Sequence, residues 1–108
     1  MTPLYDWAWF RDLVLRCDPA ATKYHGSGAS ETTVWSPKGV RTIMLDDIQQ
    51  ITGWTVEVER NCKSDNDAVA AALLEALTES ERVDLTSYVE MYDETDGVHT
   101  HLFTCEVY

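Results

Sequence analysis

Basic residues are few in this sequence: eight Lys and Arg stand against 19 Asp and Glu, and the 108-residue chain has a formal net charge of −11. Proteins that bind nucleic acid need clustered Lys and Arg to contact phosphates and release counterions. The shortage therefore excludes direct nucleic-acid binding as the expected function. A partner recognised through charge should itself be basic.

Cysteines and long apolar runs are also scarce. Cys17, Cys62 and Cys105 are odd in number, lie far apart and form no C-x-x-C pair, which argues against a disulfide framework or a zinc knuckle and favours a reducing compartment. No segment approaches the roughly 18 apolar residues that cross a bilayer, and Asp6 and Asp12 lie where a signal peptide has basic and then apolar residues. We expect a soluble, cytoplasmic protein that does not bind membranes.

Motifs of the common enzyme classes are missing as well. The segment HGSGASE places small residues beside His25, but it contains no nucleophile elbow, phosphate-binding loop or dinucleotide-binding fingerprint. The turn DETDG has carboxylates at Asp93, Glu94 and Asp96 without the spacing of a twelve-residue calcium loop. We therefore expect a non-enzymatic protein without a cofactor.

Helical spacing predicts a first helix from Thr2-Pro3 to Cys17, where Asp18-Pro19 ends it. A short helix is predicted over DIQQIT, with Asp46 as its N-cap and Gly53 at its end. The segment IQQITGWTVEVER is similar to the helix, glycine and strand of KH domains. The G-x-x-G loop that clamps nucleic acid does not precede it, so we interpret the segment as a helix and a strand rather than as a member of that family.

A third helix is predicted over AVAAALLEAL, because Ser64 and Asp67 match a capping pattern before it. Its apolar stripe consists of Val69, Ala72, Leu73, Ala76 and Leu77.

Strands are predicted where β-branched and aromatic residues gather. TTVWS and VRTIML flank the turn PKG, WTVEVER alternates with its apolar residues on one face, and VDLTSYVEMY and VHTHLFTCEVY flank DETDG. With 44% hydrophobic residues, the chain supports one core. We expect a single α+β domain over residues 1–108, with an antiparallel or mixed sheet of about five strands and helices packed on one face.

The first helix has aromatic residues on two faces. Both tryptophans cannot enter one core face. Either Trp9 is half buried under the loop 18–31, or Tyr5 and Trp9 contact a partner. The core face would be formed by Trp7, Phe10, Leu13, Val14 and Cys17, and the opposite face by Tyr5, Trp9, Asp12 and Arg16.

The C-terminal hairpin has an apolar side and an acidic side. Pairing Tyr92 with Val98 sets its register and places Asp84 opposite Glu106, a like-charge pair that costs up to about 1 kcal/mol. Turning Glu106 into the core would cost more. Alternation then assigns Val83, Leu85, Val89, Met91, Phe103, Cys105 and Val107 to the core side, and Asp84, Tyr88, Glu90, Tyr92 and Glu106 to the other.

The negative charge is concentrated in one half of the chain. Residues 65–108 contain eleven Asp and Glu against one basic residue, Arg82, whereas residues 1–64 contain eight acids and seven bases. This surface either docks on a basic protein or only solubilises the sheet. The predicted partner-binding residues are Asp84, Tyr88, Glu90, Tyr92, Asp93, Glu94 and Asp96, together with Tyr5 and Trp9.

The leading hypothesis is a small inhibitor or regulator that docks on a basic, nucleic-acid-binding protein. By composition it resembles phage inhibitors of host nucleases and of CRISPR or restriction complexes, and immunity proteins for nuclease toxins. A second hypothesis is a metal-binding protein or small enzyme in which His99, His101 and His25 are ligands. A third is a structural oligomer that associates through Tyr5 and Trp9.

Overall fold

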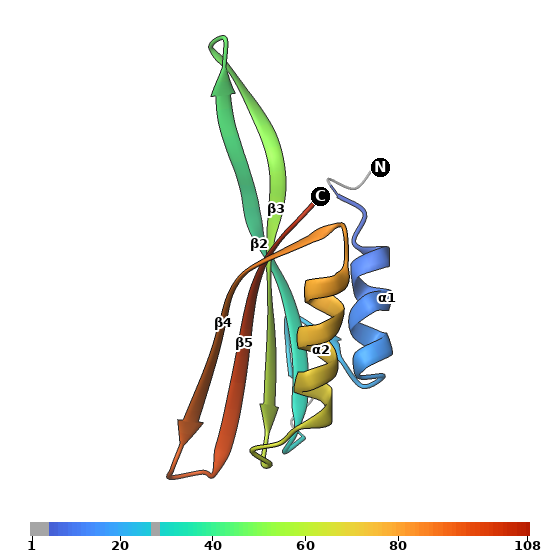
Figure 1. The fold of residues 1–108 in the computed structure, drawn as a ribbon, viewed down its shortest axis with the longest axis vertical. Coiled ribbons are helices and arrows are strands. Elements are labelled where there is room, and N and C mark those ends of the chain that lie inside the picture. The colour runs from blue at the N-terminus through green and yellow to red at the C-terminus, as the bar shows by residue number, and fades with distance from the viewer. Residues whose placement is uncertain (1–4, 27–28) are drawn as a thin grey trace.

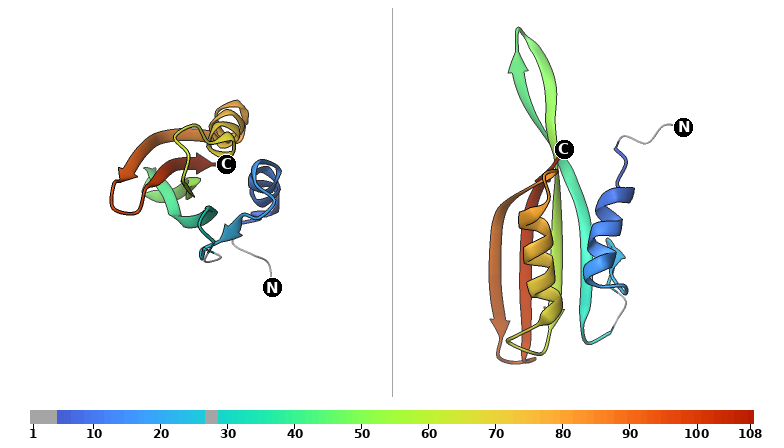
Figure 2. Two further views of the ribbon diagram at one scale, coloured as in Figure 1. Left: turned by 90° about the horizontal axis from the view of Figure 1, so that it is seen from below. Right: turned by 45° about the vertical axis from the view of Figure 1, so that its right-hand side comes forward.

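The computed structural model describes residues 5–26 and 29–108. In these residues the elements are α1 (Ala8–Cys17), β1 (Thr22–Lys23), β2 (Thr32–Leu45), β3 (Ile48–Cys62), α2 (Ala68–Glu79), β4 (Val83–Asp93) and β5 (Val98–Val107). The described strands form one five-stranded sheet in the order β1-β2-β3-β5-β4. Strands β1 and β2 are parallel, and the other pairs are antiparallel. Both helices lie on one side of the sheet (Figures 1 and 2), and the predicted α+β fold is confirmed.

The hydrophobic core lies between the helices and the sheet. Phe10, Leu13 and Val14 of α1 and Leu73 and Leu77 of α2 are buried against it. Burying each such side chain contributes about 1.5–3 kcal/mol. The sheet supplies Trp35, Val56, Val58, Phe103, Cys105 and Val107 to the same core.

Helix α1 begins later than predicted. Thr2 and Pro3 lie outside the described residues, and the helix starts at Ala8, whose amide donates to the Asp6 carboxylate at 3.0 Å. It ends at Cys17 as expected, and the Asp18 amide donates to the Val14 carbonyl. The predicted core face is confirmed for its buried residues Phe10, Leu13 and Val14, whereas Trp7 and Cys17 are only partly buried.

Strand β2 is continuous where a turn at PKG was expected. A β-bulge interrupts its register between Pro37 and Gly39. Proline cannot donate to a sheet ladder and is tolerated at bulges and on edge strands. Strand β1 pairs only with Val34 and Trp35, so β2 is an edge strand beyond that point.

The predicted helix over DIQQIT is wrong, because this segment opens strand β3. Asp46 and Asp47 have φ of 51° and 64° and form the two-residue loop between β2 and β3. Positive φ at both loop positions is the geometry of a type I′ hairpin turn, and aspartate tolerates it better than most residues. Gly53 lies inside β3 and not at the end of a helix. The similarity to KH domains therefore does not extend to the fold of this segment.

Helix α2 confirms the predicted third helix. Asp67 is its N-cap and accepts from the Ala70 amide at 2.8 Å. The buried stripe is Ala70, Leu73 and Leu77, with Val69 and Ala76 packed partly against the core.

The register of the C-terminal hairpin is confirmed at one end and shifted at the other. Asp84 pairs with Glu106 as predicted, but a bulge between Leu85 and Ser87 moves every later pair by one residue, so Tyr92 pairs with His99. An extra residue reverses the inward and outward alternation of a strand. Val89 and Met91 therefore face away from the core, contrary to prediction, and are 45% and 49% exposed.

The neighbouring residues Leu73 and Leu74 test the core assignment of α2. Leu73→Ala should lower the free energy of unfolding by about 2–5 kcal/mol, because it opens a cavity in the core. Leu74→Ala should cost far less, because Leu74 is 37% exposed. Urea titration of both variants measures the difference, and equal losses would contradict the orientation of α2.

Candidate functional site

The side of the sheet that faces away from the helices carries most of the sheet's carboxylates. Glu57 and Glu59 project there from β3, because they alternate with the buried Val56 and Val58. Asp84, Asp93 and Glu106 project to the same side by their pairing in the β4–β5 ladder. We call this set the acidic face: Glu57, Glu59, Asp84, Asp93 and Glu106.

Four residues of the acidic face lie close together. Glu106 is directly opposite Asp84 on β4 and Thr55 on β3, and Glu57 and Glu59 follow Thr55 on the same side of β3. Successive members of this row are about 5–8 Å apart, and Asp84 and Glu59 at its two ends are about 16 Å apart. Asp93 lies at the far end of β4, about 30 Å from Asp84 at 3.3 Å per residue.

Positive charge near this face comes from Arg41. Its Nη1 donates to both oxygens of Glu106 at 3.0 and 3.2 Å, and the Arg41 side chain is 61% exposed. Within residues 5–26 and 29–108, the other four carboxylates of the acidic face form no ion pair. The Glu106 side chain is 15% exposed. Arg41 offsets the charge of one carboxylate in five, so the face keeps most of its negative charge.

The remaining predicted acids lie in the β4–β5 turn. Glu94 and Asp96 are exposed there, and Gly97, with φ of 66°, donates its amide to the Asp93 carbonyl at 2.8 Å. Lys63 Nζ donates to the Asp96 carbonyl at 2.8 Å. The turn thus adds negative charge at the Asp93 end of the sheet.

The structure does not bring Tyr88, Glu90 and Tyr92 to the acidic face. The bulge in β4 turns all three to the helix side of the sheet, opposite Phe103, His101 and His99. Their neighbours are aromatic or imidazole rings: Tyr88 lies 4.9 Å from the Phe103 ring, and Tyr92 lies 4.6 Å from the His99 ring.

Tyr5 and Trp9 are occupied by contacts within the chain. Trp9 Nε1 donates to the Tyr5 hydroxyl at 3.1 Å, and that hydroxyl donates to the Tyr108 carbonyl at 2.8 Å. The Arg82 guanidinium lies 4.1 Å over the Trp9 ring and donates to the same carbonyl. Trp9 is half buried, as the first alternative predicted, but its cover is Arg82 rather than the loop 18–31.

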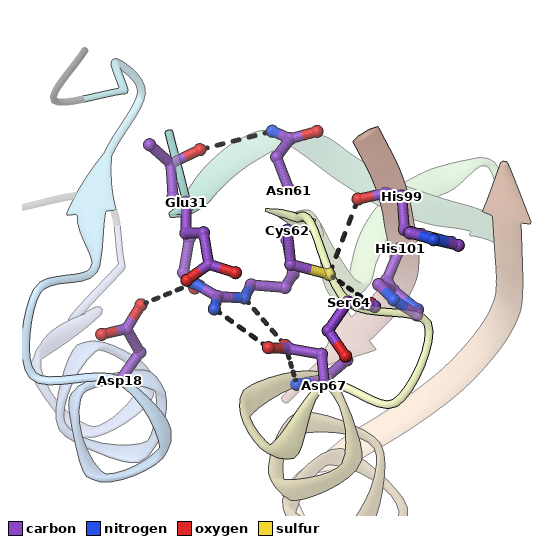
Figure 3. Close-up of polar contacts among 12 residues, drawn as sticks. Asp18, Glu31, Asn61, Cys62, Ser64, Asp67, His99 and His101 are labelled. Atoms are coloured by element: carbon purple, nitrogen blue, oxygen red, sulfur yellow. Dashed lines mark hydrogen bonds and ion pairs between the residues drawn. The ribbon is translucent and has the colours of Figure 1, made fainter. Parts of the chain in front are cut away.

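A buried ion-pair network lies at the amino-terminal end of α2 (Figure 3). Arg60, only 6% exposed, donates to both oxygens of Asp67 at 2.9 and 3.1 Å. It also reaches Asp18 and Thr33 at 3.4 Å. Burial alone would raise the pKa of Asp67, but the hydrogen bonds from Arg60 and the Ala70 amide and the charge of Arg60 outweigh it and lower that pKa.

The two histidines of β5 lie beside this network. The Tyr88 hydroxyl and His101 Nδ1 share a hydrogen bond of 2.7 Å, and burial, reinforced by Glu90, raises the pKa of Tyr88. His99 Nδ1 and His101 Nε2 lie 3.6 and 3.9 Å from one oxygen of Glu90. The buried His101 Nε2 has no hydrogen-bond partner in the described structure.

The metal hypothesis gains no third ligand from His25, which is exposed in the segment after β1. Among the residues with described positions, no group of three His, Cys, Asp or Glu could hold a metal ion. In the same residues, neither helix is long and apolar enough to cross a membrane.

Neither a family model nor a curated protein matches this chain. Three residues of the acidic face, Glu57, Glu59 and Glu106, were missing from the predicted site, although the hairpin register had already turned Glu106 to the acidic side. The signal for Glu57 and Glu59 was present in WTVEVER, because alternation that turns Val56 and Val58 to the core turns both glutamates outward.

The hydrogen bond between Tyr88 and His101 can be tested by removing one hydroxyl. Tyr88→Phe should lower the free energy of unfolding by about 1–2 kcal/mol, because the buried His101 Nδ1 loses its partner. The control is Tyr92→Phe, whose hydroxyl makes no hydrogen bond with described residues, and it should change stability by less than about 0.5 kcal/mol. Thermal unfolding monitored by circular dichroism compares the two; indistinguishable variants would contradict the assignment.

The charge of Asp67 should stabilise the fold in a pH-dependent way. Asp67→Asn retains an N-cap side chain but leaves the buried Arg60 with Asp18, at 3.4 Å, as its remaining carboxylate partner, at a cost of up to about 3–5 kcal/mol near neutral pH. Because the folded pKa is lowered, this contribution is complete above the ordinary aspartate value of about 3.9 and is lost as the pH falls below it.

Urea titrations from about pH 7 down to about pH 2 should therefore show the difference between wild type and Asp67→Asn shrinking on acidification. Asp65→Asn provides the control, because Asp65 is exposed and forms no ion pair with a described residue. A difference that does not change with pH would show that the charge of Asp67 is not the stabilising feature.

Proposed function

We propose that this protein is a non-enzymatic inhibitor or regulator whose acidic face docks on a basic protein surface. The observation that carries this proposal is the acidic face itself: five carboxylates on the helix-free side of the sheet, of which Glu106 alone has an ion pair among the described residues. Complementary potentials of this kind steer association and select partners.

The position of the carboxylates on paired strands supports recognition. Glu57, Glu59 and Glu106 project from β3 and β5, which have a hydrogen-bonded neighbour on each side. The backbone under these side chains is therefore already ordered, and binding does not require a loop to become ordered.

Apolar side chains between the acids can add contact area. Leu102 lies between Glu59 on β3 and Val89 on β4, and Met91 follows Val89 on the same side of the sheet. Interfaces combine an apolar centre with a polar rim. A surface that served only to keep the protein soluble would not need the exposed Val89 and Met91.

The partner that fits this surface is a protein whose own ligand is nucleic acid. Such proteins carry clustered Lys and Arg that contact spaced phosphates, and carboxylates spaced along neighbouring strands present a comparable row of negative charge. Occupation of that basic surface would block it. Blocking of this kind would suit a phage inhibitor of nucleases or of CRISPR and restriction complexes, or a nuclease immunity protein.

The proposal can be tested with two variants of equal charge change. Glu57→Lys, Glu59→Lys and Asp84→Lys together reverse the acidic face, whereas Asp12→Lys, Glu75→Lys and Glu79→Lys reverse exposed acids of the two helices. Immobilised wild-type protein and both variants are incubated with a cell lysate, and the bound proteins are eluted with increasing salt. The rate at which a captured basic protein associates with each of the three is then measured by biosensor.

The variant with reversed helix acids should capture the same protein as wild type. Salt should release that protein from both, because salt screens the attraction. The acidic-face variant should lose it, with an association rate at least about tenfold lower. Equal weakening in both variants would show that only net charge matters. Unchanged binding by the acidic-face variant would reject the acidic face as the recognition surface.

A further inference from the structure

The β2–β3 hairpin extends beyond the body of the protein as a two-stranded ribbon (Figure 1). The ladder between β3 and β5 stops at the pair of Trp54 and Val107, so residues 48–53 have β2 as their one described neighbour. An isolated two-stranded hairpin is at best marginally stable in water. This ribbon nevertheless carries exposed apolar side chains: Val40, Ile43, Met44, Leu45, Ile48 and Ile51.

Both faces of the ribbon carry exposed apolar side chains. The pairing of Leu45 with Ile48 and of Thr42 with Ile51 places Ile43, Leu45 and Ile48 on one face and Met44 and Ile51 on the other. Met44 and Ile48 are each 63% exposed. A contiguous exposed apolar patch on a small protein marks an interaction site.

The β2 edge of this ribbon differs from the β4 edge at the other side of the sheet. Strand β4, at the opposite edge, carries Asp84, Glu90 and Asp93, and charged side chains protect an edge from pairing with another chain. In β2, residues 39–45 carry one charge, Arg41, and face no strand on their outer side within the described chain. Their unpaired backbone groups can accept a further strand.

The charges that flank this segment match a second copy of the same segment. Lys38 and Arg41 lie toward its start, and Asp46 and Asp47 follow its end. In an antiparallel pair related by a two-fold axis, the basic end of each copy lies beside the acidic end of the other. The apolar residue Ile43 then lies near the axis.

The net charge of −11 makes two copies repel each other, but the elongated shape of the molecule reduces this repulsion. The molecule extends 51 Å along its longest axis, with the β2–β3 turn at one end and the acidic β4–β5 turn at the other (Figure 1). The screening length at physiological salt is about 8 Å. Two copies can therefore join at their β2–β3 ends while their acidic turns remain far apart.

We infer that two copies of this chain associate through the β2 edge, with residues 41–45 paired antiparallel about a two-fold axis at Ile43 to form one continuous sheet. Sedimentation equilibrium of the full chain should show a dimer. Its dissociation constant should rise at least about tenfold in Ile43→Lys, because two lysines would face each other at the axis.

The control is Ile51→Lys, which removes an isoleucine of β3 that is 59% exposed, against 41% for Ile43, and lies one strand away from the proposed pairing edge. It should retain the dimer. Both variants change only exposed positions of the ribbon, and circular dichroism checks that the body remains folded. The inference would be overturned if the wild type stayed monomeric at every soluble concentration. It would also be overturned if both variants lost dimerisation equally, because that result would indicate packing of the ribbon faces rather than pairing of the β2 edges.

Cysteine cross-linking tests the register. Ile43→Cys should form a disulfide with itself across the axis under mild oxidation, whereas Lys38→Cys should not, because its two copies would lie about 33 Å apart in this register. Raised salt should weaken the dimer far less than it weakens binding of a basic partner, because backbone hydrogen bonds and apolar contacts also hold the two copies, so the outcome is separable from the proposed function. Cross-linking at Lys38 rather than Ile43 would overturn the register.

Discussion

The buried guanidinium of Arg60 holds the layers of this fold together. Its hydrogen bonds reach Asp67 at the start of α2 and Asp18 just beyond the end of α1, so one side chain of a central strand connects the sheet to both helices. A buried arginine is costly unless it is paired, and removing its carboxylate leaves an uncompensated charge. The network therefore strongly disfavours arrangements in which either helix leaves this side of the sheet. The opposite side stays uncovered, and the carboxylates of the acidic face project there.

Much of this architecture followed from local patterns. The alternation in VHTHLFTCEVY correctly placed Phe103, Cys105 and Val107 in the core, and the capping pattern before α2 identified its start. The like-charge pair of Asp84 and Glu106 was also predicted, because the alternative buried a glutamate. In the two strand cases, a large difference in burial free energy decided between two registers.

The errors arose where one residue changed the geometry without changing the composition. A bulge after Leu85 turned Tyr88, Glu90 and Tyr92 away from the acids with which they had been grouped. A bulge at Pro37 and a turn at Asp46 and Asp47 replaced a predicted turn and a predicted helix. Bulges depend on pairing with a partner strand, which periodicity within one segment does not reveal. The pairing of Arg60 was not predicted either, because periodicity within one segment does not reveal its carboxylate partners, the helix-end residues Asp18 and Asp67.

Burial has a chemical consequence for the cysteines. Loss of solvent around Cys105, reinforced by Asp84, raises the pKa of its thiol to about 12, and burial also raises the pKa values of Cys62 and Cys17. The thiolate is the species that reacts with disulfides and oxidants. At neutral pH these higher pKa values favour the protonated, less reactive thiol. Packing thus protects the cysteines from oxidation in the fold itself, and their unpaired state does not by itself identify the compartment in which the protein acts.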